Sequence, residues 1–175
     1  MKRLFLLILL SNLCYQASSQ LAISKLLGKN SKSYKMGLGV FENYEFPLND
    51  DANQSIMLEL VDFAYFRPQN LDTGNAKGYI SIKVGYRYIF SDSKTGIFIE
   101  PQAGYVRTAD TRGDGVYKDG FALAFETGYS LEVGQGGNTL VFGVKYEADN
   151  PGNELGISSI AFRISYSFPF LRKGR

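Results

Sequence analysis

Histidine and tryptophan are both absent from this chain of 175 residues, and its only cysteine is Cys14. Histidine is the side chain whose unperturbed pKa suits proton transfer near neutral pH, so its absence removes the usual general base. Structural zinc sites also lack their common ligands, because these are histidines and sets of cysteines. We therefore expect a protein that is not an enzyme and that holds no metal and no cofactor.

Long apolar runs are missing too, with one exception at the start of the chain. Lys2 and Arg3 precede the unbroken apolar run 4–10, and small residues follow at 17–19. This pattern predicts a secretory signal peptide over residues 1–19, whose removal would take Cys14 with it. No later segment approaches the run of about eighteen apolar residues that a membrane helix needs. Basic stretches with interleaved aromatic residues are also absent, so nucleic acid is not an expected partner.

What the sequence does contain is repeated alternation of apolar and polar residues. In residues 78–90 every second residue from Ile80 to Phe90 is large and apolar, and the residues between them are small, polar or charged. Such alternation indicates a β-strand with two unlike faces. Similar segments recur at residues 35–41, 55–66, 96–106, 120–133, 139–147 and 158–170, although 55–66 is apolar in both phases.

The connections between these segments alternate in length. Short turns are predicted at 47–53, 91–96 and 134–138, and longer polar loops at 67–77, 108–119 and 148–156. Short turns at one end and long loops at the other are typical of bacterial membrane β-barrels, which have even strand numbers. Seven strands are counted here, so the eighth must come from residues 20–33, which form either the first strand or a short helix; their pattern favours the helix.

We therefore expect an all-β fold, an antiparallel up-and-down transmembrane β-barrel of about eight strands. The predicted divisions are the signal peptide 1–19, an N-terminal segment 20–33, the barrel 34–170 and a C-terminal tail 171–175.

The size of the apolar side chains indicates which face of the sheet looks inward. Large rings from every strand would overfill an eight-stranded barrel, whereas the opposite face is rich in glycine, alanine and serine. With four-residue turns, Arg87 falls opposite Glu100, and Glu126 falls opposite Lys145, all on that second face. Buried charges persist only when they are paired, so this face is predicted to line the lumen. The predicted lumen charge network is Glu59, Lys83, Arg87, Glu100, Glu126, Lys145, Glu147 and Arg163. Pro101 interrupts the ladder, and we expect a β-bulge near Glu100 to accommodate it.

Over residues 34–170 the chain resembles the small, eight-stranded type of outer-membrane β-barrel of Gram-negative bacteria. The resemblance rests on the amphipathic strands, the alternation of short and long connections, and a last strand that ends in SYSFPF. It implies a location in the bacterial outer membrane, with outer-membrane lipid and the barrel-assembly machinery as partners, the latter reading a terminal aromatic residue. It brings no functional residue with it.

A lumen filled by side chains leaves function to the outer loops or to the structure of the envelope. We expect a non-enzymatic barrel with a structural or surface-recognition role. Arg112, Gly113 and Asp114 in loop 108–119 form the tripeptide that host integrins read, so an extracellular ligand or a host surface is a candidate partner. One alternative is a secreted, soluble lipocalin-like barrel that binds an apolar ligand, although lipocalins usually open with a Gly-x-Trp segment. The other alternative is a small transport channel with a water-filled lumen.

Overall fold

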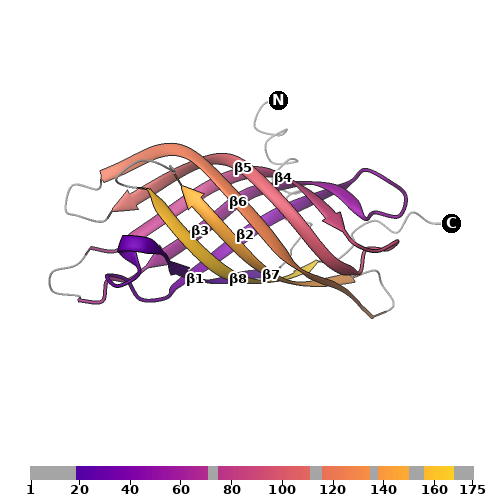
Figure 1. Cartoon of the computed structure of the whole chain (residues 1–175), viewed down its shortest axis with the longest axis horizontal. Helices are drawn as coiled ribbons and strands as arrows, with labels where there is room; N and C mark the ends of the chain where they lie inside the picture. The colour runs from indigo at the N-terminus through magenta and orange to yellow at the C-terminus, as the bar shows by residue number, and fades with distance from the viewer. Residues whose placement is uncertain (1–18, 71–74, 111–115, 135–137, 150–155, 168–175) are drawn as a thin grey trace, which may run out of the picture.

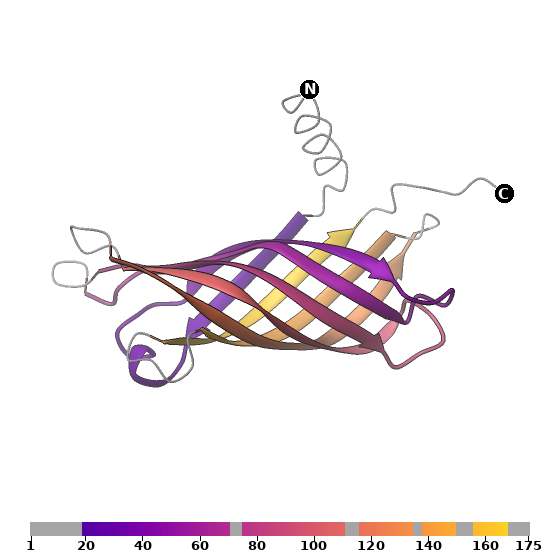
Figure 2. The same ribbon diagram turned by 90° about the horizontal axis from the view of Figure 1, so that it is seen from above.

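Antiparallel β-strands close into a barrel in this computed structural model, which describes residues 19–70, 75–110, 116–134, 138–149 and 156–167. Each strand pairs with its neighbours in sequence, and β1 pairs with β8 to close the sheet (Figures 1 and 2). The strands are β1 (Ser19–Leu26), β2 (Gly37–Pro47), β3 (Gln54–Phe66), β4 (Lys77–Ile89), β5 (Gly96–Asp110), β6 (Val116–Val133), β7 (Asn138–Asp149) and β8 (Ile157–Ser167). Within the described ranges no helix is long and apolar enough to span a membrane. The predicted all-β barrel is confirmed.

The two ends of the barrel differ in their connections. The short turns that follow β2, β4 and β6 lie at one end, together with the start of β1 and the end of β8 (Figure 2). The β1–β2 connection, with the 3-10 helix η1 (Gly28–Asn30), lies at the other end, where β3, β5 and β7 also finish. In exported barrels the short turns face the periplasm, so we call these the periplasmic and the extracellular end.

The first strand corrects the sequence-based interpretation of residues 20–33. Ser19–Leu26 is β1, so the short helix that the pattern favours is wrong there, and only the short turn η1 of this segment is helical. β1 pairs with β2 through Ile23 opposite Leu38, and with β8 through Ile23 opposite Phe162. Two ladders hold this strand, and such tertiary pairing overrides a local preference for helix.

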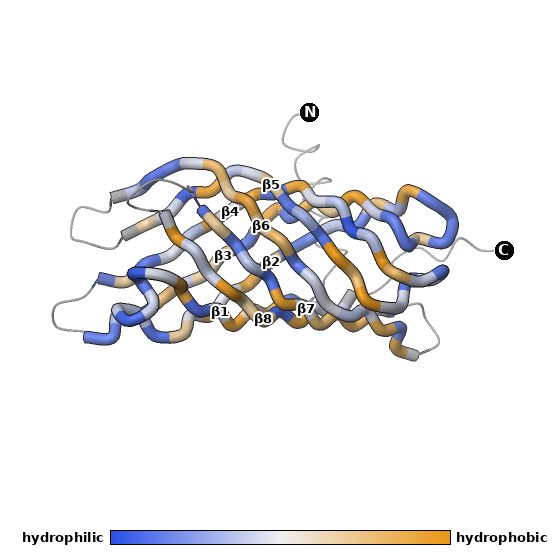
Figure 3. The backbone as a smooth tube through the Cα atoms, in the orientation of Figure 1, coloured by the Kyte–Doolittle hydropathy of each residue, from blue (hydrophilic) through white to orange (hydrophobic). Residues whose placement is uncertain are grey.

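The apolar face of the sheet is the outer face, as the bulk of its side chains predicts. Ile82, Phe125 and Phe162 are 51%, 45% and 48% exposed, whereas Lys83 and Arg163 are 1% and 2% exposed. Hydropathy alternates along the strands accordingly (Figure 3). A soluble barrel would need the opposite arrangement, so the lipocalin-like alternative is wrong.

An exposed ion pair marks the extracellular limit of the outward apolar face. Strands β5 and β6 extend farther than predicted, so much of 108–119 is strand rather than loop. Arg107 faces outward next to Asp119, with 2.6 Å between Arg107 Nε and Asp119 Oδ1 and about half of each side chain exposed. Charges in this position lie in the headgroup region or in water rather than in hydrocarbon. The tripeptide Arg112–Asp114 falls outside the described residues.

A β-bulge in β3 explains why residues 55–66 look apolar in both phases. The register shifts between Glu59 and Asp62, so Leu60 and Val61 together occupy the place of one outward residue. Glu59 and Asp62 are both buried as a result, although their spacing would put them on opposite faces of a regular strand.

The bulge that we expected near Glu100 is absent. Gly85 lies opposite Gln102 and Tyr88 lies opposite Ile99, which is the same register on both sides of Pro101. Pro101 faces outward and is exposed. The strand therefore tolerates the proline without inserting a residue.

Candidate functional site

The interior of the barrel holds a network of buried charges contributed by six strands. The structure places all eight residues of the predicted lumen network there and adds two carboxylates, Asp62 and Asp149. The carboxylates are Glu59 and Asp62 on β3, Glu100 on β5, Glu126 on β6, and Glu147 and Asp149 on β7; the cations are Lys83 and Arg87 on β4, Lys145 on β7 and Arg163 on β8. Strands β1 and β2 face this network with the small residues Ala22 and Gly39 and with the ring of Phe41.

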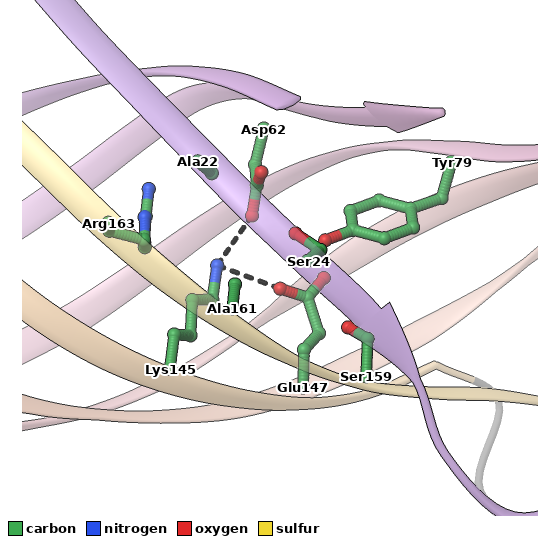
Figure 4. Close-up of a pocket in the computed structure, with 9 residues that line it drawn as sticks. All are labelled: Ala22, Ser24, Asp62, Tyr79, Lys145, Glu147, Ser159, Ala161 and Arg163. Atoms are coloured by element: carbon green, nitrogen blue, oxygen red, sulfur yellow. Dashed lines mark hydrogen bonds and ion pairs between the residues drawn. The ribbon is translucent and has the colours of Figure 1, made fainter. Parts of the chain in front are cut away.

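Two lysines and two carboxylates form the centre of the network, and Figure 4 draws Lys145, Asp62 and Glu147 of this group. Lys83 Nζ lies 2.9 Å from Asp62 and 2.8 Å from Glu147. Lys145 Nζ lies 2.5 Å from Asp62 and 2.7 Å from Glu147, and both lysines also contact Glu59. Figure 4 shows the Lys145 amino group joined to the carboxylates of Asp62 and Glu147, with small side chains of β1 and β8, such as Ala22 and Ala161, nearby. Within the described residues this cluster leaves no room for a water molecule at its centre.

Arg163 joins this centre to β6. Its guanidinium donates to Glu126, with 2.7 Å between nitrogen and oxygen, and to Glu59, while its other side stacks on the ring of Phe41 at 3.4 Å. Glu126 reaches Arg163 by lying across Gly143, where a Cβ atom would collide with the carboxylate. The glycine therefore permits an ion pair between strands that are not neighbours.

Of the two predicted ion pairs, the structure contains one. Arg87 Nε donates to Glu100 at 2.7 Å, as the turn length predicts, and Gln102 donates to the same carboxylate. Glu126 and Lys145 are aligned partners in the β6–β7 ladder, yet their charges pair with other residues. The register was therefore predicted correctly, whereas the partners of Glu126 and Lys145 were not, because inside a narrow barrel a side chain can reach across the lumen.

Apolar layers close the lumen above and below the charges. At the extracellular end the layer consists of Leu26, Ala64, Phe66, Tyr79, Val106, Ala122 and Ile157. At the periplasmic end it consists of Ile89, Phe98 and Val141. Together with the ion pairs these layers fill the interior, which is the packing expected for eight strands.

Sequence reasoning missed Asp62 and Asp149 for two different reasons. Asp62 is out of phase with Glu59, and only the bulge turns it inward; two acidic residues three apart in a strand that is apolar in both phases could have signalled it. Asp149 lies in what looks like the start of a polar loop, because β7 ends farther along the chain than its apolar pattern. Its two carboxylate oxygens have no hydrogen-bond partner among the described residues.

The extracellular end carries exposed cations on the β1–β2 connection. Lys29, Lys32 and Lys35 are exposed there, and residues 27–36 contain no acidic residue. Backbone hydrogen bonds from Gln69 to Ser33 and from Lys35 to Arg67 hold this connection against the end of β3. We call Lys29, Lys32 and Lys35 the loop patch.

Solved structures with a similar architecture are small membrane barrels. Neisserial surface protein A matches with a TM-score of 0.64 and 14% identity, over 87% of this chain and 98% of that one. Ail, the attachment invasion locus protein of Yersinia pestis, solved with the heparin analogue sucrose octasulfate, gives 0.56 and 15%, over 87% and 95%. The outer membrane enzyme PagL gives 0.52 and 12%, over 87% and 99%. No family model and no curated protein matches the sequence.

At such identities the similarity concerns the fold alone. One protein with this fold, PagL, is an enzyme, but sharing the fold does not show whether this chain has an activity. Two features of this chain agree with the fold of a membrane barrel. Its strands expose apolar side chains on the outer face, and its charges are buried in pairs inside. The chain has the fold of the small, eight-stranded outer-membrane β-barrels, with an apolar outer face and a closed interior.

Proposed function

We propose that this protein is a non-enzymatic outer-membrane barrel that recognises polyanionic ligands at its extracellular end. The observation that carries the proposal is the filled lumen. Ion pairs and two apolar layers occupy the interior, so the surface that faces the medium is what remains for binding. The absence of histidine supports a role without proton-transfer chemistry.

The loop patch indicates the chemical class of the ligand. Three exposed lysines on one connection, with no acidic residue between them, attract sulfate and phosphate groups. Ail, which shares the fold, was solved with a heparin analogue, and this supports a sulfated ligand for a barrel of such a shape. The Arg112–Asp114 tripeptide stays a separate prediction for a host surface.

Binding of sucrose octasulfate to the barrel in zwitterionic nanodiscs tests this function. We expect measurable binding that weakens as salt rises, because exposed charges are screened. Replacing Lys29, Lys32 and Lys35 together by glutamine should weaken binding about tenfold, since each exposed ion pair contributes up to about 1 kcal/mol. Lys94→Gln, which removes an exposed cation from a periplasmic turn, is the matched control and should bind like the unchanged protein.

Planar-bilayer conductance distinguishes this function from the small transport channel. A lumen filled as described should conduct no ions at moderate voltage. Steady conductance that changes when Arg87 is replaced by alanine would show an open lumen and would overturn the proposal.

A further inference from the structure

The outer face carries an apolar groove that crosses β1, β2, β3 and β8. Its volume is about 710 Å³, and the side chains that line it face the lipid. They are Leu21, Ile23, Leu38, Val40, Phe63, Tyr65, Phe162 and Ile164, with Ala22 and Gly39 on the strands beneath. The groove arises because aliphatic residues on β1 and β2 lie between the larger rings of Phe63 and Tyr65 on β3 and of Phe162 on β8.

Two cations stand where this groove reaches the extracellular end. Ile23, Leu38 and Tyr65 form one row across β1, β2 and β3. Lys25 and Arg67 come two residues after Ile23 and Tyr65, and both are exposed. An apolar groove that ends at two cations has the shape and charge of a site for an anionic amphiphile.

These cations differ from the other outward cation at this edge of the barrel. Arg107 on β5 is neutralised by Asp119. Neither Lys25 nor Arg67 has a carboxylate within ion-pair distance in the part of the chain that the structure describes. Their charges are therefore available to a ligand, and Arg67 can form paired hydrogen bonds with a phosphate.

We propose that the groove binds acyl chains of a phosphorylated glycolipid of the outer leaflet, with Lys25 and Arg67 holding its phosphate groups. The cations lie at the extracellular end, so the headgroup belongs to the outer leaflet. Lys25 lies on β1 and Arg67 directly follows the end of β3, with β2 between them, and this spacing suits a wide headgroup with more than one phosphate. The site is distinct from the loop patch, because the two share no residue.

Native mass spectrometry of the barrel, released from micelles that contain bisphosphorylated lipid A, tests the proposal. We expect the protein to retain one lipid A molecule, and to retain phosphatidylglycerol or fully dephosphorylated lipid A at least about tenfold less well. The double variant Lys25→Gln and Arg67→Gln should lose this preference. Val40→Phe, which fills the groove and keeps the surface apolar, should weaken retention with the phosphate-binding cations intact.

The control is Lys94→Gln, which removes an exposed cation from a periplasmic turn, far from the groove and from the loop patch, and should retain lipid A unchanged. A gel run with and without heating shows that each variant is folded, because intact membrane barrels resist detergent until heated. Equal retention by all folded variants would overturn the proposal, and so would equal retention of phosphatidylglycerol. Efficient disulfide-linked dimers of Ile23→Cys in lipid A-containing membranes would also overturn it, because a second copy would then occupy the groove.

The proposal of lipid binding and the proposed function can be contradicted independently of each other. The loop-patch variants test binding of sucrose octasulfate, and the groove variants test retention of lipid A. A loss in one assay with no change in the other assigns each ligand to its own surface.

Discussion

At the scale of single residues, the buried charges differ in how many partners they contact. Glu59 contacts three cations, whereas Asp149 has no hydrogen-bond partner among the described residues. Removing one member of a buried ion pair leaves its partner uncompensated, and this costs more than the pair itself contributes. The two carboxylates should therefore respond to neutralisation in different ways.

Glu59→Gln should lower the free energy of unfolding by about 3–5 kcal/mol, because Lys145 and Arg163 would lose a counter-charge away from water. Asp149→Asn should change it by less than about 1 kcal/mol or raise it, since the carboxylate accepts no hydrogen bond among the described residues that the change would remove. Denaturant titration of the barrel in lipid vesicles measures both. Equal losses would show that Asp149 has a cationic partner.

A carboxylate on the lipid-facing side gives a second prediction at this scale. Glu42 lies between Val40 and Tyr44 on the outward face of β2, half-buried, and accepts a hydrogen bond from the Tyr44 hydroxyl at 2.6 Å. A charge in this position is costly in hydrocarbon, so Glu42→Leu should stabilise the barrel in a bilayer by about 1–2 kcal/mol. Glu132→Leu at the exposed periplasmic end of β6 is the control and should have little effect. Destabilisation by Glu42→Leu would indicate that Glu42 has a partner in the membrane.

The rim pair on β5 and β6 gives a prediction about pH. Hydrogen bonds from Arg107, with a smaller contribution from Tyr105, lower the pKa of the Asp119 carboxyl from 3.8 to about 2. A lowered pKa means that the pair stabilises the rim fully above pH 3.8 and loses this effect as the pH falls through about 2. Carboxyl NMR should show Asp119 titrating near 2, and Arg107→Gln should return it toward 3.8. Titration near 3.8 in the unchanged protein would show that the pair is not formed.

At the scale of elements, the bulge in β3 keeps two carboxylates on the same face. Alternation indicated the strands that are regular, such as β4 and β6, because each exposes one face to lipid. It could not indicate the bulge, since Leu60 and Val61 are both apolar and hide the change of phase. For residues 20–33 the first strand and a short helix were both left open, with the helix favoured, because β1 is short and its place in the sheet depends on pairing with β2 and β8.

Deleting residues from β3 tests this reading of the bulge. Without Leu60 the strand becomes regular, and Glu59 and Asp62 both still face the lumen, so the barrel should fold with its charge network intact. Deleting Leu58, one residue before Glu59, leaves no register that keeps both carboxylates inside together with Ser55 and Met57. That variant should lose about 3–5 kcal/mol more stability, the loss expected for a broken buried pair. Similar stability of the two deletions would contradict the assigned bulge.

At the scale of the whole molecule, the distribution of apolar and charged side chains is an inversion of that in a soluble protein. Bulky apolar side chains cover the outside, paired charges fill the centre, and apolar layers close both ends. The inversion was predictable, because side-chain volume and the opposite signs of Arg87 and Glu100 both pointed to it. The partners across the lumen were not, because the ion pairs of Arg163 with Glu59 and Glu126 join strands that do not share a ladder.

The most direct test of the inversion is the accessibility of spin labels in a bilayer. Ile82, Phe125 and Phe162 are each replaced by cysteine and labelled, after Cys14 has been removed with the predicted signal peptide or replaced. We predict that all three labels collide readily with molecular oxygen, which dissolves in lipid, and rarely with a water-soluble nickel complex. Labels shielded from both reagents would place these side chains in a packed core and would contradict the account.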